Sequence, residues 1–272
     1  MDRSFSVLLS VYDKEKPEFL KASLDSVFCQ TLRSNDVVLV EDGKLGESLE
    51  TVIRNYEKYF PELHVIRFKK NRGLGYALND GLKYCQNELV ARMDTDDIAK
   101  PNRFEKQFKV MQEHQEYGMI SSWIDEFQNV PGDSLSKRIL PESPEENLKY
   151  AKSRCPVNHP TVMYRKSEVM KAGGYQTKLF PEDYFLWIKM LQNGCQIYNI
   201  QESLLWFRFS PETFKRRGGW KYACDEIKTQ WNVYKMGFIN VPILCKNIVI
   251  RFVTRIMPNR IRSLIYNLIR MQ

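Results

Sequence analysis

The stretch Val90–Asp97, VARMDTDD, places three aspartates directly behind an apolar run. At this spacing Asp94, Asp96 and Asp97 repel one another, so the segment needs either full solvation or a nearby cation. Mg²⁺ and Mn²⁺ prefer oxygen ligands and are often held by one or two carboxylates together with substrate phosphates. A D-x-D at a strand end could offer one carboxylate to such a metal. The alternative is an aspartate-rich turn in which Asp97 caps the next helix.

Four short apolar runs alternate with segments of helical spacing around this stretch. The expected strands are 5–11, 37–40, 64–68 and 89–93, and the expected helices begin at Pro17, near Leu49 and near Leu74. The alternation predicts an α/β fold with a mainly parallel sheet flanked by helices. Ligands of such sheets bind outside the carboxyl ends of the strands. Four polar tips would gather there, as in a nucleotide site: Tyr12-Asp13, Glu41–Gly43, Asn71–Gly75 and Asp94–Asp97.

The second half of the sequence has a more mixed pattern. Helical spacing covers 101–113, the segment from Pro181 through Asn193, and 219–236. Strand-like runs cover 119–127, 158–164 and 203–209, and a polar connection covers 129–146.

The end of the chain holds most of the excess positive charge. The net charge is +8, and residues 237–272 contain six Lys/Arg and no Asp or Glu. Apolar residues crowd one set of helical positions in 243–272, and Pro258 divides this segment, which predicts two short basic amphipathic helices. Such helices tend to lie on anionic membrane surfaces. Nucleic acid is the competing partner of a basic patch, but these cations alternate with apolar residues, so we expect none. A helix packed on the domain with a basic outer face is the other alternative.

The cysteines and the amino terminus bear on the expected location. Six cysteines show no paired spacing, which favours reduced thiols in the cytoplasm. The apolar run in MDRSFSVLLSVY is too short for a signal peptide, and no apolar run is long enough for a membrane span. With the basic tail, these features predict a cytoplasmic protein that is peripheral on the inner face of the cell membrane.

Six motifs, taken in order, resemble those of family 2 glycosyltransferases with the GT-A fold. They are FSVLLSVYDKEKPEFLKASLDSVFCQT (5–31), VVLVEDG (37–43), NRGLGYALNDGL (71–82), VARMDTDD (90–97), NHPTVMYRKSEVMKAGGY (158–175) and FPEDYFLWIKMLQNG (180–194). The likeness is nearest to bacterial enzymes of capsule, exopolysaccharide and O-antigen assembly. It implies an inverting, metal-dependent transfer of a hexose or N-acetylhexosamine from a nucleotide sugar, with UDP as the expected nucleotide. The implied acceptor is a growing saccharide, expected on a lipid diphosphate.

The resemblance also implies a nucleotide-sugar site. Tyr12, with Ser10 behind it, would line the base pocket, where an aromatic ring can stack on a nucleobase. Asp42 would bond the edge of the base, which is expected to be uracil. Asn71 and Asn79, from the third loop, would complete the donor site.

The metal and the diphosphate would lie at the acidic cluster. Asp94 and Asp96 would reach the ribose and a Mn²⁺ or Mg²⁺ ion. Which of Asp94, Asp96 and Asp97 binds the metal is open, and Asp96 is favoured. Arg208, at a strand end, and Arg217, in a basic glycine-containing loop, are candidates for the donor diphosphate, and a solvated basic loop is the alternative for Arg217.

Asp183 is the implied general base. A single well-placed carboxylate suits an inverting transfer, and the helix that opens at Pro181 would help to keep this carboxylate ionised. The alternative is that Glu182 and Asp183 are only charges of the first helical turn. His159 is a further candidate on the acceptor side, although a lone histidine at a strand start is more often structural.

The expected organisation has three parts. Residues 1–98 form the nucleotide-sugar-binding half, 99–236 the acceptor-binding and catalytic half, and 237–272 the membrane-associating segment. The alternative function is a non-catalytic nucleotide-sugar-binding or scaffold protein, against which the intact Asp94, Asp96 and Asp183 argue. A dinucleotide oxidoreductase would rest on Gly73-Leu74-Gly75 alone. We reject it because the third glycine is missing and the motif follows the third strand.

Overall fold

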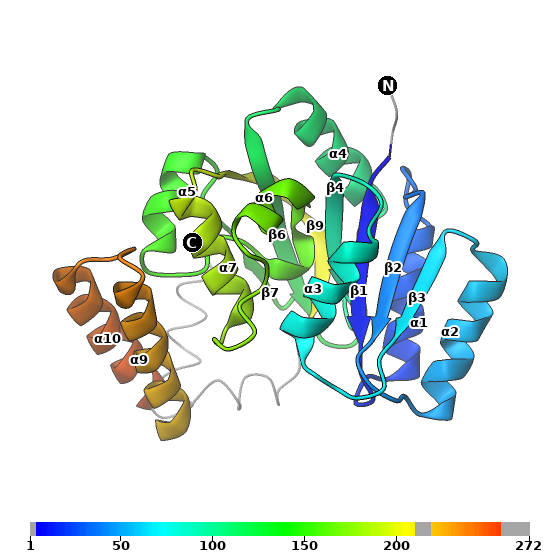
Figure 1. Ribbon diagram of the computed structural model, residues 1–272, viewed down its shortest axis with the longest axis horizontal. Helices are drawn as coiled ribbons and strands as arrows, with labels where there is room; N and C mark the ends of the chain where they lie inside the picture. The colour runs from blue at the N-terminus through cyan, green and yellow to red at the C-terminus, as the bar shows by residue number, and fades with distance from the viewer. Residues whose placement is uncertain (1–3, 210–218, 257–272) are drawn as a thin grey trace.

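A computed structural model describes residues 4–209 and 219–256, and at its centre lies a sheet with helices on both faces (Figure 1). The strands are β1 (Ser6–Val11), β2 (Asp36–Glu41), β3 (Leu63–Arg67), β4 (Leu89–Asp94), β5 (Ile98–Ala99), β6 (Tyr117–Phe127), β7 (Ser136–Arg138), β8 (Met163–Arg165) and β9 (Gln196–Arg208). The helices are α1 (Pro17–Phe28), α2 (Glu47–Tyr59), α3 (Leu74–Tyr84), α4 (Arg103–Glu113), α5 (Pro144–Ala151), α6 (Lys166–Lys171), α7 (Glu182–Gln192), α9 (Trp220–Lys235) and α10 (Val241–Ile256). The predicted α/β fold is confirmed.

The sheet changes character halfway across. Its order is β3-β2-β1-β4-β8-β6-β9-β5, and β7 pairs with β6. β3, β2, β1 and β4 run parallel, as do β6 and β9, whereas β8, β7 and β5 pair antiparallel with their neighbours. In this register Ser10 of β1 lies level with Val40 and Asp94. The polar tips of β1, β2 and β4 therefore meet at one edge, as the sequence predicts.

Each face of the sheet has its own apolar core, because successive side chains of a strand point to opposite faces. Leu9 and Leu39 face the core covered by α1, α2 and α4. Leu8 and Val38 face the second core, which α3, α6 and α7 cover. Both faces are thus buried, which explains why the central strands read as continuous apolar runs.

The last two helices form a pair at the end of the molecule opposite α2 (Figure 1). They dock on α7 through a third apolar cluster, in which Phe185 and Ile188 meet Val233 of α9 and Leu244 of α10. Among the described residues, no helix combines the length and the apolar character needed to cross a membrane. The second basic helix, expected beyond Pro258, falls outside the described ranges.

Several boundaries differ from the sequence prediction. The expected polar connection 129–146 contains β7 and the start of α5, which opens with a reciprocal capping box between Ser143 and Glu146. The expected strand 158–164 begins with a 3-10 turn at His159–Thr161, because Pro160 has no N–H for a strand ladder. β9 begins earlier than predicted, at Gln196.

Gly81 gives a test of how tightly α3 packs on the sheet. A Cβ at this position would lie 2.6 Å from Cδ1 of Leu8 and 2.7 Å from Cγ2 of Val40. We expect Gly81→Ala to lower the free energy of unfolding by about 1–3 kcal/mol, because overpacking forces side chains or backbone to shift. Gly75→Ala is the matched control in the same helix, where the new Cβ would meet only ordinary contacts at 3.5 Å. Urea unfolding curves compare the two, and equal stability of both variants would contradict this packing.

Candidate active site

The acidic cluster at the end of β4 has the composition of a cation site. Single carboxylate oxygens of Asp94, Asp96 and Asp97 lie within 4.8 Å of one another. Asp97 is fully buried, and its Oδ1 accepts a hydrogen bond of 2.8 Å from the backbone N–H of Arg208. Its Oδ2 has no hydrogen-bond partner among the described residues. Asp97 does not cap α4, whose N-cap is Asn102.

Burial and mutual repulsion act together on these carboxyl groups. Burial, the Asp94 carboxylate and Glu15 raise the pKa of Asp96 to about 7. Burial, followed by Asp96 and Asp94, raises the pKa of Asp97 well above its usual range. A divalent cation would relieve this repulsion, and an all-carboxylate set of ligands suits Mg²⁺ or Mn²⁺. The residues present therefore fit the expected metal.

A buried arginine lies beneath the cluster. The guanidinium of Arg92 is almost fully buried on β4 and forms an ion pair with Asp94, while its Nε and Nη1 have no hydrogen-bond partner among the described residues. Arg103, also buried, donates from Nη2 to the carbonyl oxygen of Arg92 at 2.6 Å. The sequence analysis missed Arg92, although a charged residue inside the apolar run LVARM was a visible signal.

Arg208 reaches the same cluster from β9. Its Nε donates to the carbonyl oxygen of Asp96 at 2.9 Å, and its guanidinium lies over the ring of Phe19, 3.9 Å from the centroid. Glu15, another residue that the sequence analysis missed, accepts a hydrogen bond of 2.9 Å from Thr95. Arg208 therefore lies beside the carboxylates, and its contact with a donor diphosphate stays a prediction. Arg217 falls outside the described residues.

The residues predicted to bind the donor lie near the carboxyl ends of the parallel strands. Some of their side chains are accessible, and others already form hydrogen bonds within the protein. Tyr12 is 44% exposed just beyond β1, Asn71 is exposed in the third loop, and Ser10 is half-buried on β1. These three side chains are accessible to a ligand at the strand ends. Their contact with a donor stays a prediction.

Asp42 and Asn79 already make bonds within the protein. The carboxylate of Asp42 is buried and accepts hydrogen bonds from the backbone N–H groups of Arg72 at 2.7 Å and Gly73 at 2.8 Å. Asn79 exchanges two hydrogen bonds with the backbone of Tyr175, at 2.7 and 2.9 Å. Asp42 thus shapes the third loop, and Asn79 ties α3 to the segment before α7. The sequence did not predict these bonds, and donor contacts from either residue remain untested.

Asp183 lies in the first turn of α7. Its Oδ1 accepts a hydrogen bond of 2.8 Å from the N–H of Tyr184, as expected near a helix start. Burial nevertheless raises the pKa of Asp183, against the opposing effects of that N–H, Arg92 and Arg138. The expectation was that the helix start keeps this carboxylate ionised. In the structure the effect of desolvation on the pKa of Asp183 is larger than that of the helix start.

His159 belongs to the same group of side chains, whereas Glu182 does not. Nδ1 of His159 lies 4.0 Å from Oδ2 of Asp183, and Nε2 lies 3.0 Å from the hydroxyl of Tyr175. Burial lowers the pKa of His159 well below its usual value, so its ring is neutral at physiological pH. Glu182, the neighbour of Asp183, faces a separate cavity of about 330 Å³ beside α3.

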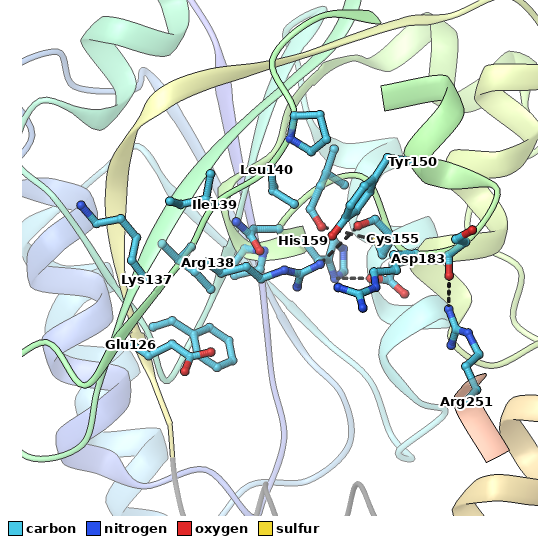
Figure 2. Close-up of a pocket in the computed structure, with 18 of the residues that line it drawn as sticks. Glu126, Lys137, Arg138, Ile139, Leu140, Tyr150, Cys155, His159, Asp183 and Arg251 are labelled. Carbon is cyan, nitrogen blue, oxygen red and sulfur yellow. Dashed lines mark hydrogen bonds and ion pairs between the residues drawn. The ribbon is translucent and has the colours of Figure 1, made fainter. Parts of the chain in front are cut away.

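One large cavity connects the two acidic sites. Its volume is about 1040 Å³, and its lining includes Asp94, Asp183 and His159 (Figure 2). Six basic residues from three parts of the chain also line it: Lys137, Arg138, Arg154, Lys246, Arg251 and Arg255. The cavity can therefore hold an anionic molecule that touches the acidic cluster at one point and Asp183 at another. The sequence did not predict its basic wall.

Comparison with known proteins shows the family to which the chain belongs. The family described as Glycosyl transferase family 2 matches residues 6–172. The chain is 42% identical to an Escherichia coli protein named UDP-Gal:alpha-D-GlcNAc-diphosphoundecaprenol beta-1,3-galactosyltransferase, with 96% of this chain and 94% of that protein covered. It is 38% identical to the amylovoran biosynthesis glycosyltransferase AmsE of Erwinia amylovora, with 96% and 97% covered.

Solved structures share the fold at low sequence identity. S. aureus TarS 1–349 in complex with UDP-GlcNAc superposes with a TM-score of 0.68 at 17% identity, over 93% of this chain and 72% of that one. The mannosyltransferase PcManGT from Pyrobaculum calidifontis, in complex with GDP-Man and Mn²⁺, gives 0.64 at 14% identity, over 91% and 68%. The predicted GT-A fold is confirmed. The chain therefore belongs to glycosyl transferase family 2, resembles bacterial polysaccharide enzymes of that family, and is a glycosyltransferase.

Proposed function

We propose that the protein is an inverting, metal-dependent hexosyltransferase. It would move a hexose or N-acetylhexosamine from a UDP sugar to a saccharide carried on a lipid diphosphate, in surface polysaccharide synthesis. The observation that carries this proposal is the single cavity that joins Asp94 of the acidic cluster to Asp183. The E. coli relative, named for UDP-Gal and a diphosphoundecaprenol-linked sugar, supports the donor and acceptor classes, and the Erwinia relative supports a role in polysaccharide synthesis.

The donor side of the proposal lies within residues 1–98. Asp96 and Asp94 would hold Mn²⁺ or Mg²⁺, whose charge, when bound, would offset the negative charge developing on the departing UDP. Arg208 lies beside this cluster and adds a fixed positive charge. The exposed ring of Tyr12 is available to stack on the base.

The proposed base of the acceptor side, Asp183, lies within residues 99–236. Asp183 would take the proton of the acceptor hydroxyl as that oxygen attacks the anomeric carbon, on the face opposite the departing UDP. A pKa raised by burial suits this role, because a base is most effective when its pKa approaches the working pH. The neutral ring of His159 adds no competing positive charge beside the carboxylate.

Substitution of Asp183 tests the proposed base. We expect Asp183→Asn to reduce transfer from a UDP sugar by about 10²–10⁴-fold, because the proton acceptor is lost. UDP binding, measured by calorimetry, should persist, and chelation of divalent ions should stop transfer by the unaltered enzyme. Asp133→Asn, at an exposed loop position, is the matched control.

The outcomes separate the proposal from its alternative. Transfer by Asp183→Asn at the unaltered rate would exclude Asp183 as the base. UDP-sugar binding without turnover, across a panel of donors and lipid-diphosphate acceptors, would favour the non-catalytic binding or scaffold function instead.

We also propose that residues 237–272 hold the enzyme on the inner, cytoplasmic face of the cell membrane. Val249 and Val253, one turn apart on α10, are 62% and 45% exposed, and Trp220 of α9 is 67% exposed. Trp220 packs edge-on against Phe252 of α10. An exposed apolar strip on a helix that also carries Lys246 matches the pattern of interfacial helices.

Vesicle binding tests the membrane contact. We expect Val249→Asp with Val253→Asp to weaken co-sedimentation with phosphatidylglycerol vesicles at least tenfold, because each valine loses about 1.5 kcal/mol or more of apolar burial. Val130→Asp, at a loop valine that is 55% exposed, is the matched control. Undiminished binding of the double variant would remove this strip from the membrane contact.

A further inference from the structure

Two arginines from separate elements bind one short turn of the cavity wall, and the turn itself contains a third, Arg154. Nη2 of Arg138, at the end of β7, donates to the carbonyl oxygen of Cys155 at 3.2 Å. Nη2 of Arg251, on α10, donates to the carbonyl oxygen of Ser153 at 2.5 Å. Arg154 lies between these two carbonyl groups in the chain. The turn is therefore held from both sides, and it carries the exposed side chain of Arg154, which also lines the cavity.

The positive charge of this wall is only partly balanced. Glu226 forms ion pairs with both Arg251 and Arg255, and Lys137 lies 3.9 Å from a carboxylate oxygen of Asp125. In contrast, within residues 4–209 and 219–256, no ion pair involves Arg138, Arg154 or Lys246. The cavity lining contains six basic residues but only three acidic ones, Asp94, Glu126 and Asp183. Concentrated positive charge in a cavity of this size favours an anionic ligand.

The wall lies next to the proposed base. Figure 2 shows Arg138 reaching from β7 to the centre of the cavity, where His159, Asp183 and Tyr150 also lie, and Arg251 entering from α10. Arg138 is close enough to Asp183 to lower its pKa, although burial dominates. The rings of Tyr150 and His159 give the cavity two flat surfaces, on which a sugar ring can pack.

We propose that Arg138, Arg154 and Lys246 form a subsite for the diphosphate of the acceptor. The inference rests on the proposed function and deepens it. Guanidinium groups bind phosphate oxygens through paired N–H donors, and a lysine adds a point charge. With the sugar beside Asp183, the diphosphate would meet the arginines, and the lipid would leave toward α10 and its exposed valines.

The chemistry of the cavity favours the acceptor over the donor as the source of this diphosphate. The donor diphosphate is expected at the acidic cluster, beside Asp96 and Arg208. Arg138, Arg154 and Lys246 come instead from β7, the turn after α5, and α10, none of which belongs to the parallel strands β3, β2, β1 and β4.

Two acceptors that differ in one group test the subsite. One is N-acetylglucosamine linked through α-diphosphate to an alkyl chain, and the other carries the same sugar and chain through a neutral ether. We expect Arg138→Ala with Arg154→Ala to raise KM for the diphosphate acceptor about 100-fold, roughly tenfold for each lost charged hydrogen bond. KM for the neutral acceptor should change little, so the preference for diphosphate should collapse. Lys58→Ala with Lys109→Ala removes two exposed lysines outside the cavity and should preserve that preference.

Two further measurements assign each failure to its cause. Calorimetry on Asp183→Asn compares the affinities for the diphosphate acceptor and the neutral acceptor without turnover. Loss of catalysis alone would therefore count only against the proposed function. Equal affinity of the two acceptors would overturn the subsite. A variant pair that loses UDP affinity but keeps the acceptor preference would also overturn it, because the arginines would then hold the donor diphosphate.

Discussion

The ion pair between Arg92 and Asp94 is the constraint on which the site depends. An arginine buried on a central strand is costly unless a carboxylate compensates it, and Asp94 provides that charge. Arg92 also favours the ionised forms of Asp96 and Asp97, although burial and mutual repulsion still raise the pKa of both. The same Arg92 charge opposes ionisation of His159 and favours that of Asp183. One buried cation thus influences both acidic sites of the cavity.

The two proposed substrate sites lie in parts of the molecule with different strand pairing. The parallel strands β3, β2, β1 and β4 bring their polar tips to one edge, which suits the proposed donor. The cavity wall beyond Asp183 comes from β7, the turn after α5, and α10, which are joined by side-chain hydrogen bonds to carbonyl groups. β4 belongs to both regions, because it pairs with β1 in the parallel half and its Asp94 lines the cavity.

Much of the fold could be predicted from the sequence, whereas only part of the site could. Apolar runs such as 37–40 identify the strands because burial on both faces leaves no polar alternation, and the D-x-D at Asp94 identifies the acidic cluster. The local sequence around Asp42 and Asn79 could not predict that these side chains form hydrogen bonds with backbone groups 30 and 96 residues away. The convergence of Arg138 and Arg251 on one turn likewise joins segments that no local pattern connects.

The position of the basic wall bears on how such enzymes diversify. β7, the turn after α5, and α10 lie outside the parallel half. With the acceptor in the proposed subsite, substitutions there would alter acceptor recognition without disturbing the packing beneath the parallel strands. Glu226, which fastens α10 through two arginines, keeps this wall in place while individual side chains change. New glycan linkages could therefore arise in evolution through substitutions in this wall, while the parallel strands of the nucleotide edge stay unchanged.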